Sequence, residues 1–365
     1  MLNNKTIGVV IPAYNEENQI SMVLDSMPGF VDRIVVINDC SKDNTAQIVQ
    51  GTMDKLPASD LALPSIVGTL VPNKYNLADQ LQNEGLVAEN EKLAACEVIE
   101  GKGDRDRIIL INLKTNSGVG AAVARGYKWC KDRTIDCVVK IDGDGQMDPG
   151  EIESICNPVV FEGIDYVKGN RLIHKSAHLV IPRVRFFGNS ILSILTKVAS
   201  GYWSISDTQT AFTAISKEAL NSIDLSKIYP TYGYPNDLLV KLNMNFCSIR
   251  EVGIKPVYRI GEQSKMKIGK LIPRLSWLLI RLFIKRIWNK YLLKSFHPLF
   301  LLYHIALLLL IISVPFLVKI LILAFQGLQA NPVTVLAFVF LFISGFQSLM
   351  FAMWMDIQDN DRLQR

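Results

Sequence analysis

Two long apolar segments near the C-terminus limit the possible fold of this chain more than any other feature. Residues 298–325 are apolar apart from Tyr303, His304, Ser313 and Lys319, and residues 333–355 carry no charge. As helices rising 1.5 Å per residue, both segments are long enough to cross the roughly 30 Å hydrocarbon core of a bilayer. The uncharged link 326–332 is short enough to join only antiparallel helices. We therefore predict a transmembrane helical hairpin over residues 297–355.

Charge is distributed unevenly along the sequence. The 365 residues carry a net charge of +5, but residues 263–355 hold ten Lys and Arg and no Asp or Glu, which leaves the remainder acidic. Nine of these cations lie between residues 265 and 294, and none lies in the link 326–332. An excess of Lys and Arg marks the cytoplasmic flank of a transmembrane segment. We expect an integral membrane protein with its large N-terminal part and its tail, residues 356–365, in the cytoplasm. It would lie in the cell membrane of a prokaryote or in the ER membrane of a eukaryote.

The basic segment that precedes the hairpin, residues 261–296, has the spacing of amphipathic helices. Its basic residues 270, 274, 281 and 285 recur at steps of four and seven among bulky apolar residues. This pattern places charge on one helical face and bulk on the other. Such a helix could lie in the headgroup layer with Trp277, Trp288 and Tyr291 at the interface. It could equally be an ordinary basic flank with no part in substrate binding.

The first 260 residues alternate strand and helix patterns, which predicts one large α/β domain. Apolar, largely β-branched runs at residues 7–11, 34–38, 108–113 and 138–141 predict buried strands, each followed by a polar or glycine-containing turn. This order predicts βαβ units and a parallel sheet. Ligands bind beyond the carboxyl ends of the strands in open sheets of this kind. Residues 51–107 interrupt the pattern, and we expect them to form an inserted surface subdomain.

Polar and aromatic residues follow the first two predicted strands. The first strand is followed by the residues PAYNEE, 12–17, and the second by DCSKDNT, 39–45. Carboxylate and amide groups beside an aromatic ring suit a nucleotide, because they can hydrogen-bond its base and ribose. Asn15 and Ser41 are also good helix N-caps, so each motif alone is compatible with a purely structural role.

A pair of aspartates follows the fourth predicted strand. Asp142 and Asp144 flank Gly143 in the sequence KIDGDGQMDP. Because the chain turns there, both carboxylates can reach one point, and hard oxygen ligands suit Mg²⁺ or Mn²⁺. An acidic turn without a ligand is the alternative interpretation. The position directly after a buried strand favours a divalent cation that would bridge a diphosphate.

Six segments together resemble the family 2 glycosyltransferases, and among them the polyprenyl-phosphate glycosyltransferases, which include the dolichol-phosphate mannose synthases. These segments are VIPAYNEE, VVINDCSKDNT, NSGVGAAVARG, KIDGDGQMDP, KGNR and DTQTAF, spread over about residues 7–216. The resemblance implies an α/β domain of the GT-A fold, Rossmann-like with a mostly parallel sheet. It also implies a donor-nucleotide site lined by Pro12, Ala13, Tyr14, Glu16, Asp39 and Asp142, and a metal site formed by Asp142, Asp144 and Gln146. The turn at residues 116–120 is equally well a capped helix start, and it is left out of this site.

Later residues indicate a site for an anionic acceptor. By the same resemblance, Arg171 matches the arginine that the family uses near a lipid phosphate, and Asp207 matches its acceptor-side aspartate. We expect Arg183, Arg185 and Lys265 to complete the phosphate site, since guanidinium groups bind phosphate in a fork. Solvated surface positions are the alternative for these arginines. Together with Asp142 and Asp144, Arg171 and Asp207 are the predicted catalytic residues.

The sequence therefore predicts a membrane enzyme. We expect it to transfer one sugar from a UDP- or GDP-linked donor to a polyprenyl phosphate, with inversion and with Mg²⁺ or Mn²⁺. We also expect a homo-oligomer and no binding of nucleic acid. One alternative is an enzyme of the same fold that acts on a hydroxyl of a lipid-linked saccharide or glycolipid, for which Asp207 or Asp237 would serve as base. The other is a non-catalytic, membrane-anchored assembly subunit.

Overall fold

A mixed sheet of eight strands forms the centre of the N-terminal domain. The computed structural model describes residues 1–56, 59, 61–65, 67, 71, 73–99, 105–175, 183–257 and 268–364. The strand order is β3-β4-β2-β1-β5-β7-β6-β8. The strands are β1 (Ile7–Ala13), β2 (Arg33–Asn38), β3 (Cys96–Ile99), β4 (Ile108–Leu113), β5 (Cys137–Lys140), β6 (Tyr166–Asn170), β7 (Thr213–Ser216) and β8 (Ile249–Gly253).

The four strands predicted from the sequence are β1, β2, β4 and β5, and they form the parallel centre of the sheet. Two short strands depart from the parallel pattern: β7 pairs antiparallel with both β5 and β6, and β3 pairs antiparallel with β4 at one edge. The α/β architecture predicted from the sequence is confirmed. The insertion contributes the edge strand β3, so it extends the sheet as well as covering its surface.

Helices cover both faces of the sheet because successive strand residues point to opposite sides. Val10 and Ile37 lie in the core beneath α4 (Val119–Asp132), while Val9, Ile11 and Val36 lie in the core on the other face. That second face is covered by α1 (Ile20–Asp25), α2 (Thr45–Lys55) and α5 (Ile152–Glu162). α4 packs very close to the sheet: a Cβ on Gly126 would lie 2.5 Å from Val10.

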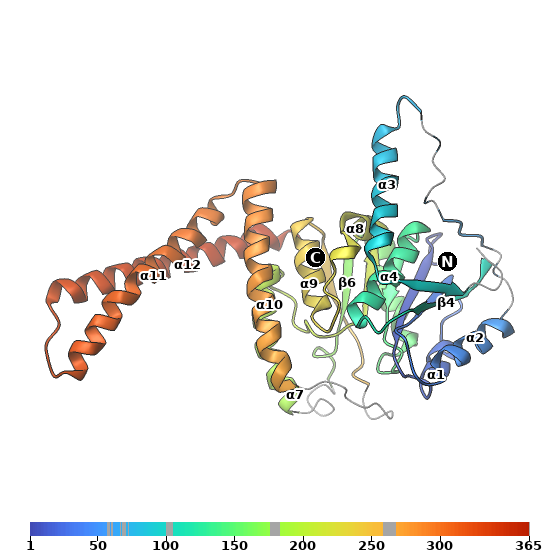
Figure 1. Cartoon of the computed structure of the whole chain (residues 1–365), viewed down its shortest axis with the longest axis horizontal. Coiled ribbons are helices and arrows are strands. Elements are labelled where there is room, and N and C mark those ends of the chain that lie inside the picture. The colour runs from blue at the N-terminus through green and yellow to red at the C-terminus, as the bar shows by residue number, and fades with distance from the viewer. Residues whose placement is uncertain are drawn as a thin grey trace.

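The second half of the domain consists of short helices around β6, β7 and β8. They are the 3-10 turn η2 (Pro149–Glu151), α7 (Arg183–Ser200), α8 (Lys217–Ser222), the 3-10 turn η3 (Leu225–Lys227) and α9 (Tyr234–Met244). The insertion folds as α3 (Leu77–Lys92), which projects from the body in Figure 1.

Three further helices follow the N-terminal domain. They are α10 (Ile268–Trp288), α11 (Pro298–Phe325) and α12 (Pro332–Asp361), with the π-helical turn η4 (Asn289–Lys294) between the first two. α11 and α12 are both long and apolar enough to cross a membrane, and they pack against each other as a hairpin beside the body (Figure 1).

The basic helix α10 packs on the N-terminal domain through α7 and α9. Its residues Leu275, Leu279 and Leu282 are buried, whereas Trp277 is exposed. Tyr291, expected at the membrane interface, is buried instead, and so are Arg286 and Lys290. Arg286 forms a two-pronged ion pair with Asp356 of α12, with both nitrogen–oxygen distances at 2.7 Å and both side chains 0% exposed.

The end of the chain differs from the short tail expected at residues 356–365. α12 continues to Asp361, and Leu363 and Gln364 lie against the N-terminal domain. Figure 1 accordingly places the C-terminal end beside α9. Polar side chains at the end of an otherwise apolar helix explain this docking, because Asp356 and Asn360 find buried partners on α9, α10 and η4.

Candidate active site

The loops that follow β1 and β2 are joined by hydrogen bonds. The amide N–H of Asn15 donates to Ser41 Oγ at 3.0 Å, and the amide N–H of Glu16 donates to Thr45 Oγ1 at 2.9 Å. The predicted donor residues Pro12, Ala13, Tyr14 and Glu16 thus lie beside the 39–45 loop. Asn15 has a φ of +54°, which Asn tolerates better than most residues and which lets the chain turn directly after the strand.

Asp39 holds a turn that was not expected to belong to the site. Its two carboxylate oxygens accept the amide N–H groups of Ser117 at 2.7 Å and Gly118 at 2.9 Å. Gly118 has a φ of +90°, and a Cβ on Gly120 would lie 2.0 Å from the carbonyl oxygen of Tyr229. The glycines at positions 118 and 120 were the sequence signal for this close backbone packing. Turn 116–120 therefore belongs to the site as a neighbour of Asp39.

The aspartate pair lies directly after β5 and against the end of β1. A Cβ on Gly143 would be 3.4 Å from both the Ala13 Cβ and the Pro12 carbonyl oxygen. The fully buried Lys140 forms an ion pair with Asp142, and the Gln146 amide N–H donates to Asp144 Oδ1 at 3.0 Å. The structure therefore brings Asp142 and Asp144 together with the predicted donor residues.

The electrostatics of this pair fit a cation site. Burial, the charge of Asp142 and, more weakly, the charge of Glu16 raise the pKa of Asp144 to about 6. A bound cation would relieve this repulsion. Among the described residues, no group of three or more His, Cys, Asp and Glu side chains is arranged to hold a metal. A pair of carboxylates is nevertheless sufficient for Mg²⁺, which is commonly bound by one or two carboxylates together with water and substrate phosphates.

Arg171 and Asp207, predicted separately, form one ion pair. Arg171 Nε donates to Asp207 Oδ2 at 2.8 Å and Arg171 Nη2 donates to Asp207 Oδ1 at 3.0 Å. The Asp207 side chain is 3% exposed and that of Arg171 is 22% exposed. Burial opposes ionisation of Asp207, but hydrogen bonds and charge from Arg171 outweigh it and lower its pKa. Asp207 therefore remains an anion that orients the guanidinium group.

A lysine and a glutamate lie next to this pair. Lys168 is fully buried and donates to the Thr210 carbonyl oxygen, and burial lowers its pKa to about 8. Glu251 of β8 accepts the amide N–H groups of Ser206 and Asp207 at 2.8 and 3.1 Å. No motif singled out Glu251, because it lies 44 residues beyond Asp207.

The remaining predicted residues contribute less to the described site. Arg183 and Arg185 lie in the first turn of α7, but their side chains fall outside the described part of the structure. Lys265 also lies outside the described residues. Asp237 is 4% exposed and accepts hydrogen bonds from the Tyr229 amide and Lys241. These contacts give Asp237 a structural role in holding the start of α9 rather than that of a base.

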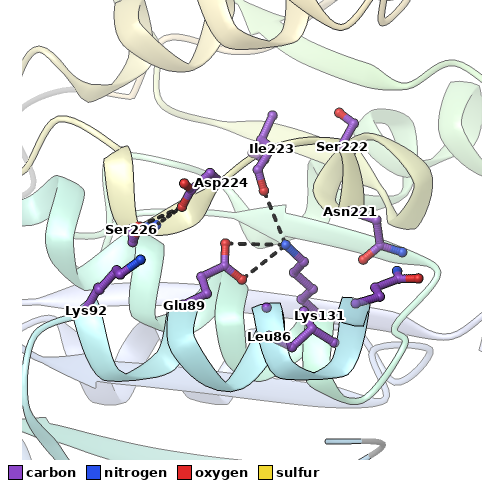
Figure 2. A pocket seen from close by; sticks show the side chains of 11 residues that line it. Leu86, Glu89, Lys92, Lys131, Asn221, Ser222, Ile223, Asp224 and Ser226 are labelled. Atoms are coloured by element: carbon purple, nitrogen blue, oxygen red, sulfur yellow. Dashed lines mark hydrogen bonds and ion pairs between the residues drawn. The ribbon is translucent and has the colours of Figure 1, made fainter. Parts of the chain in front are cut away.

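A separate cavity of about 320 Å³ lies between the insertion helix α3 and the segment 221–226. Figure 2 shows Lys131 at its centre, with its ammonium group between Glu89 and the Ile223 carbonyl oxygen. Glu89 also accepts the Leu225 amide N–H at 2.6 Å. These contacts anchor the insertion to the domain, and none of the predicted site residues lines the cavity.

Comparison with known proteins identifies the family of the chain. The profile of Glycosyl transferase family 2 matches residues 8–60 and 78–224, more than half of the chain, and its gap falls within the insertion. A UDP-N-acetylglucosamine–dolichyl-phosphate N-acetylglucosaminyltransferase of Methanococcus voltae is 27% identical over 70% of this chain and 87% of its own length. Polyprenol monophosphomannose synthase of Mycolicibacterium smegmatis is 23% identical over 71% of this chain and 80% of its own length.

Among solved structures, the chain aligns with glucosyl-3-phosphoglycerate synthase from Mycobacterium tuberculosis in complex with uridine diphosphate. The TM-score is 0.46, with 20% identity over 78% of this chain and 80% of that one. The family assignment rests on the sequence profile and on the fold described above. The chain belongs to glycosyltransferase family 2 and is a glycosyltransferase.

Proposed function

We propose that the protein transfers a single sugar from a UDP- or GDP-linked donor to a polyprenyl phosphate in the bilayer, with inversion at the anomeric carbon. The names of the relatives support this class of acceptor, since one is a dolichyl-phosphate and another a polyprenol monophosphate sugar transferase. The two apolar helices support a lipid substrate, because an enzyme held at the membrane meets such a substrate without extracting it.

The register of the sheet carries the proposal. Thr213 of β7 pairs with Lys140 of β5 on one side and with Lys168 of β6 on the other. Neighbouring strands lie about 4.8 Å apart, so β5 and β6 are about 10 Å apart at this edge. Asp142 and Asp144 follow β5, and Arg171 follows β6. A donor diphosphate at the carboxylates and an anionic acceptor at the arginine would therefore lie at the same edge of the sheet, two strands apart.

Mg²⁺ or Mn²⁺ at Asp142 and Asp144, with Gln146 beside them, would neutralise the negative charge that develops on the leaving diphosphate. Asp39 and the loops 12–17 and 39–45 would bind the nucleoside. Lys140 fixes the direction of the Asp142 carboxylate through their ion pair.

Arg171 would orient the acceptor phosphate, and Asp207 would hold the guanidinium in place. A phosphate monoester has a second pKa near 6, so the attacking oxygen is already anionic at about pH 7 and no general base is needed. This favours a phosphate acceptor over a hydroxyl acceptor, because both candidate bases are engaged: Asp207 by Arg171, and Asp237 by Lys241.

The test is a transfer assay with protein purified in detergent. The protein is incubated with Mn²⁺, a panel of radiolabelled UDP- and GDP-sugars and a short polyprenyl phosphate, with the matching polyprenol and a glycolipid as control acceptors. We expect label in the chloroform phase with one donor and only with the phosphorylated lipid. Transfer to the glycolipid instead would favour the hydroxyl-acceptor alternative. Donor binding without any transfer would favour a non-catalytic subunit.

A further inference from the structure

The last residues of the chain extend the catalytic sheet. The Ile249 amide N–H of β8 donates to the Leu363 carbonyl oxygen at 2.7 Å, and Ile249 and Gln364 form a parallel bridge. Leu363 is 7% exposed and packs into the same hydrophobic core as Ile249. The segment after the second membrane helix is therefore part of the catalytic domain.

Gln364 holds the beginning of the loop that carries Asp207. Its side-chain oxygen accepts the Ser204 amide N–H at 2.5 Å and the Ser204 hydroxyl at 2.6 Å. Its side-chain N–H donates to the Asn360 carbonyl oxygen at 3.2 Å, which ties it to the end of α12. The 204–207 loop is thus fastened at its first residue to the membrane hairpin.

Glu251 holds the other end of the same loop. One carboxylate oxygen accepts the amide N–H groups of Ser206 and Asp207, and the other accepts from Asn170 Nδ2 at 2.7 Å. Asn170 directly precedes Arg171. Strand β8 therefore links the two regions. Its residue Ile249 contacts the chain end, and its residue Glu251 contacts Asp207 and the neighbour of Arg171.

Buried polar contacts hold the membrane end of this connection to the domain. The Arg286–Asp356 ion pair is fully buried, and Lys290 donates to Asn360 Oδ1 at 2.5 Å and to Asn243 Oδ1 at 3.1 Å. A displacement of α12 relative to the domain must therefore also displace Gln364 and the loop that it holds.

From these contacts we infer that Gln364 is a positioning residue for the acceptor site: it fixes the 204–207 loop, and through Asp207 the Arg171 guanidinium, relative to the membrane hairpin. The inference rests on the proposed function, because it assigns Arg171 to the acceptor phosphate. It makes the chain end a determinant of how tightly the anionic lipid binds, while donor binding at the ends of β1, β2 and β5 is independent of it.

The test compares three variants of the full-length protein in detergent. Gln364→Ala removes the side-chain oxygen that accepts hydrogen bonds from Ser204, and Gln364→Glu keeps an oxygen at that position. Arg362→Ala is the matched control, since Arg362 is 64% exposed, pairs with Asp359 and lies two residues away. We expect Gln364→Ala to raise the KM for polyprenyl phosphate about tenfold, because the variant loses the two hydrogen bonds that hold Ser204. The KM for the donor and the melting temperature should be unchanged. Gln364→Glu should restore the acceptor KM to within about threefold, and Arg362→Ala should match the wild type.

Hydrogen exchange tests the positioning without relying on transfer. Gln364→Ala should speed amide exchange in residues 204–207 and leave the turn 116–120 as in the wild type. Unchanged exchange in 204–207, or an acceptor KM within twofold of the wild type, would overturn the inference. A wild type that transfers no sugar to any polyprenyl phosphate would instead overturn the proposed function, whereas the exchange result would still decide whether Gln364 positions the loop.

Discussion

At the scale of single residues, the Arg171–Asp207 ion pair determines the charge state of the proposed acceptor site. Asp207 is almost completely buried, and it stays charged because Arg171 donates two hydrogen bonds to it. A carboxylate whose folded pKa is lowered stabilises the fold above its unfolded pKa of about 3.9, and this contribution is lost as the pH falls through the folded pKa.

We therefore predict that Asp207→Asn destabilises the protein by about 2 kcal/mol at pH 7, because the guanidinium loses its anionic partner. The loss should shrink as the pH falls below about 4, where Asp207 of the unfolded wild type takes up a proton, and it should disappear once the pH falls through the lowered pKa of the folded protein. Denaturant unfolding in detergent at pH 7 and pH 3 measures both values. A difference between variant and wild type that stays the same at both pH values would contradict this account.

The sequence identified Arg171 and Asp207 one at a time but not their pairing. Arg171 of KGNR and Asp207 of DTQTAF are 36 positions apart in the sequence, and only the pairing of β6 with β7 brings them together. Glu251 was missed as well, because its partners, two backbone N–H groups and the Asn170 side chain, are distant in the sequence and form no motif with it. Asp142 and Asp144 were predictable, because a buried strand followed by a turn positions both of them locally.

At the scale of elements, periodicity predicted that α10 is helical but did not show which charges it buries. Arg286 looks like any other basic residue of the juxtamembrane segment, and its partner Asp356 lies 70 residues further along the chain. The antiparallel strand β7 was not predicted either. It has four residues, too few to show a direction, and its orientation depends on its neighbours β5 and β6.

The buried Arg286–Asp356 contact leads to a prediction about how the hairpin is attached. Asp356→Leu should lower stability by about 3–5 kcal/mol, because it leaves the Arg286 charge buried without its counter-ion. The double variant Arg286→Met with Asp356→Leu should recover part of this loss. Thermal unfolding in detergent checks both values, and a double variant less stable than Asp356→Leu alone would argue against a charge-based attachment.

At the scale of the whole molecule, the distribution of charge predicts how the protein would be oriented in a membrane. The cationic segment before α11 and the uncharged link after it predict that the link 326–332 lies on the side opposite the catalytic domain. The docking of residues 363–364 on β8 requires both ends of the hairpin to lie on the catalytic side. The apolar composition of residues 298–355 made the hairpin predictable from the sequence. The return of the chain end to the sheet could not be predicted in this way.

Cysteine labelling checks this topology. A Cβ added at Gly327 would have nothing within 4 Å, so the link accepts a new side chain there, although its φ of +69° adds some strain. In sealed vesicles, Gly327→Cys should react with a membrane-impermeant maleimide from the side opposite to that on which the exposed native Cys40 reacts. Labelling of both from the same side would contradict a membrane-spanning hairpin.

The central claim is that the pair Asp142 and Asp144 supports sugar transfer to a lipid phosphate by holding a divalent cation. The most direct measurement is the transfer rate as a function of Mn²⁺ concentration for the wild type, for Asp144→Asn and for the control Asp148→Asn, whose exposed side chain caps η2. We predict that EDTA abolishes sugar transfer by the wild type and that added Mn²⁺ restores it. The transfer rate of Asp144→Asn should be at least about 100-fold lower than that of the wild type at every Mn²⁺ concentration. Asp148→Asn should behave like the wild type. Wild-type transfer that persists in EDTA, or an Asp144→Asn variant with full activity, would contradict the account.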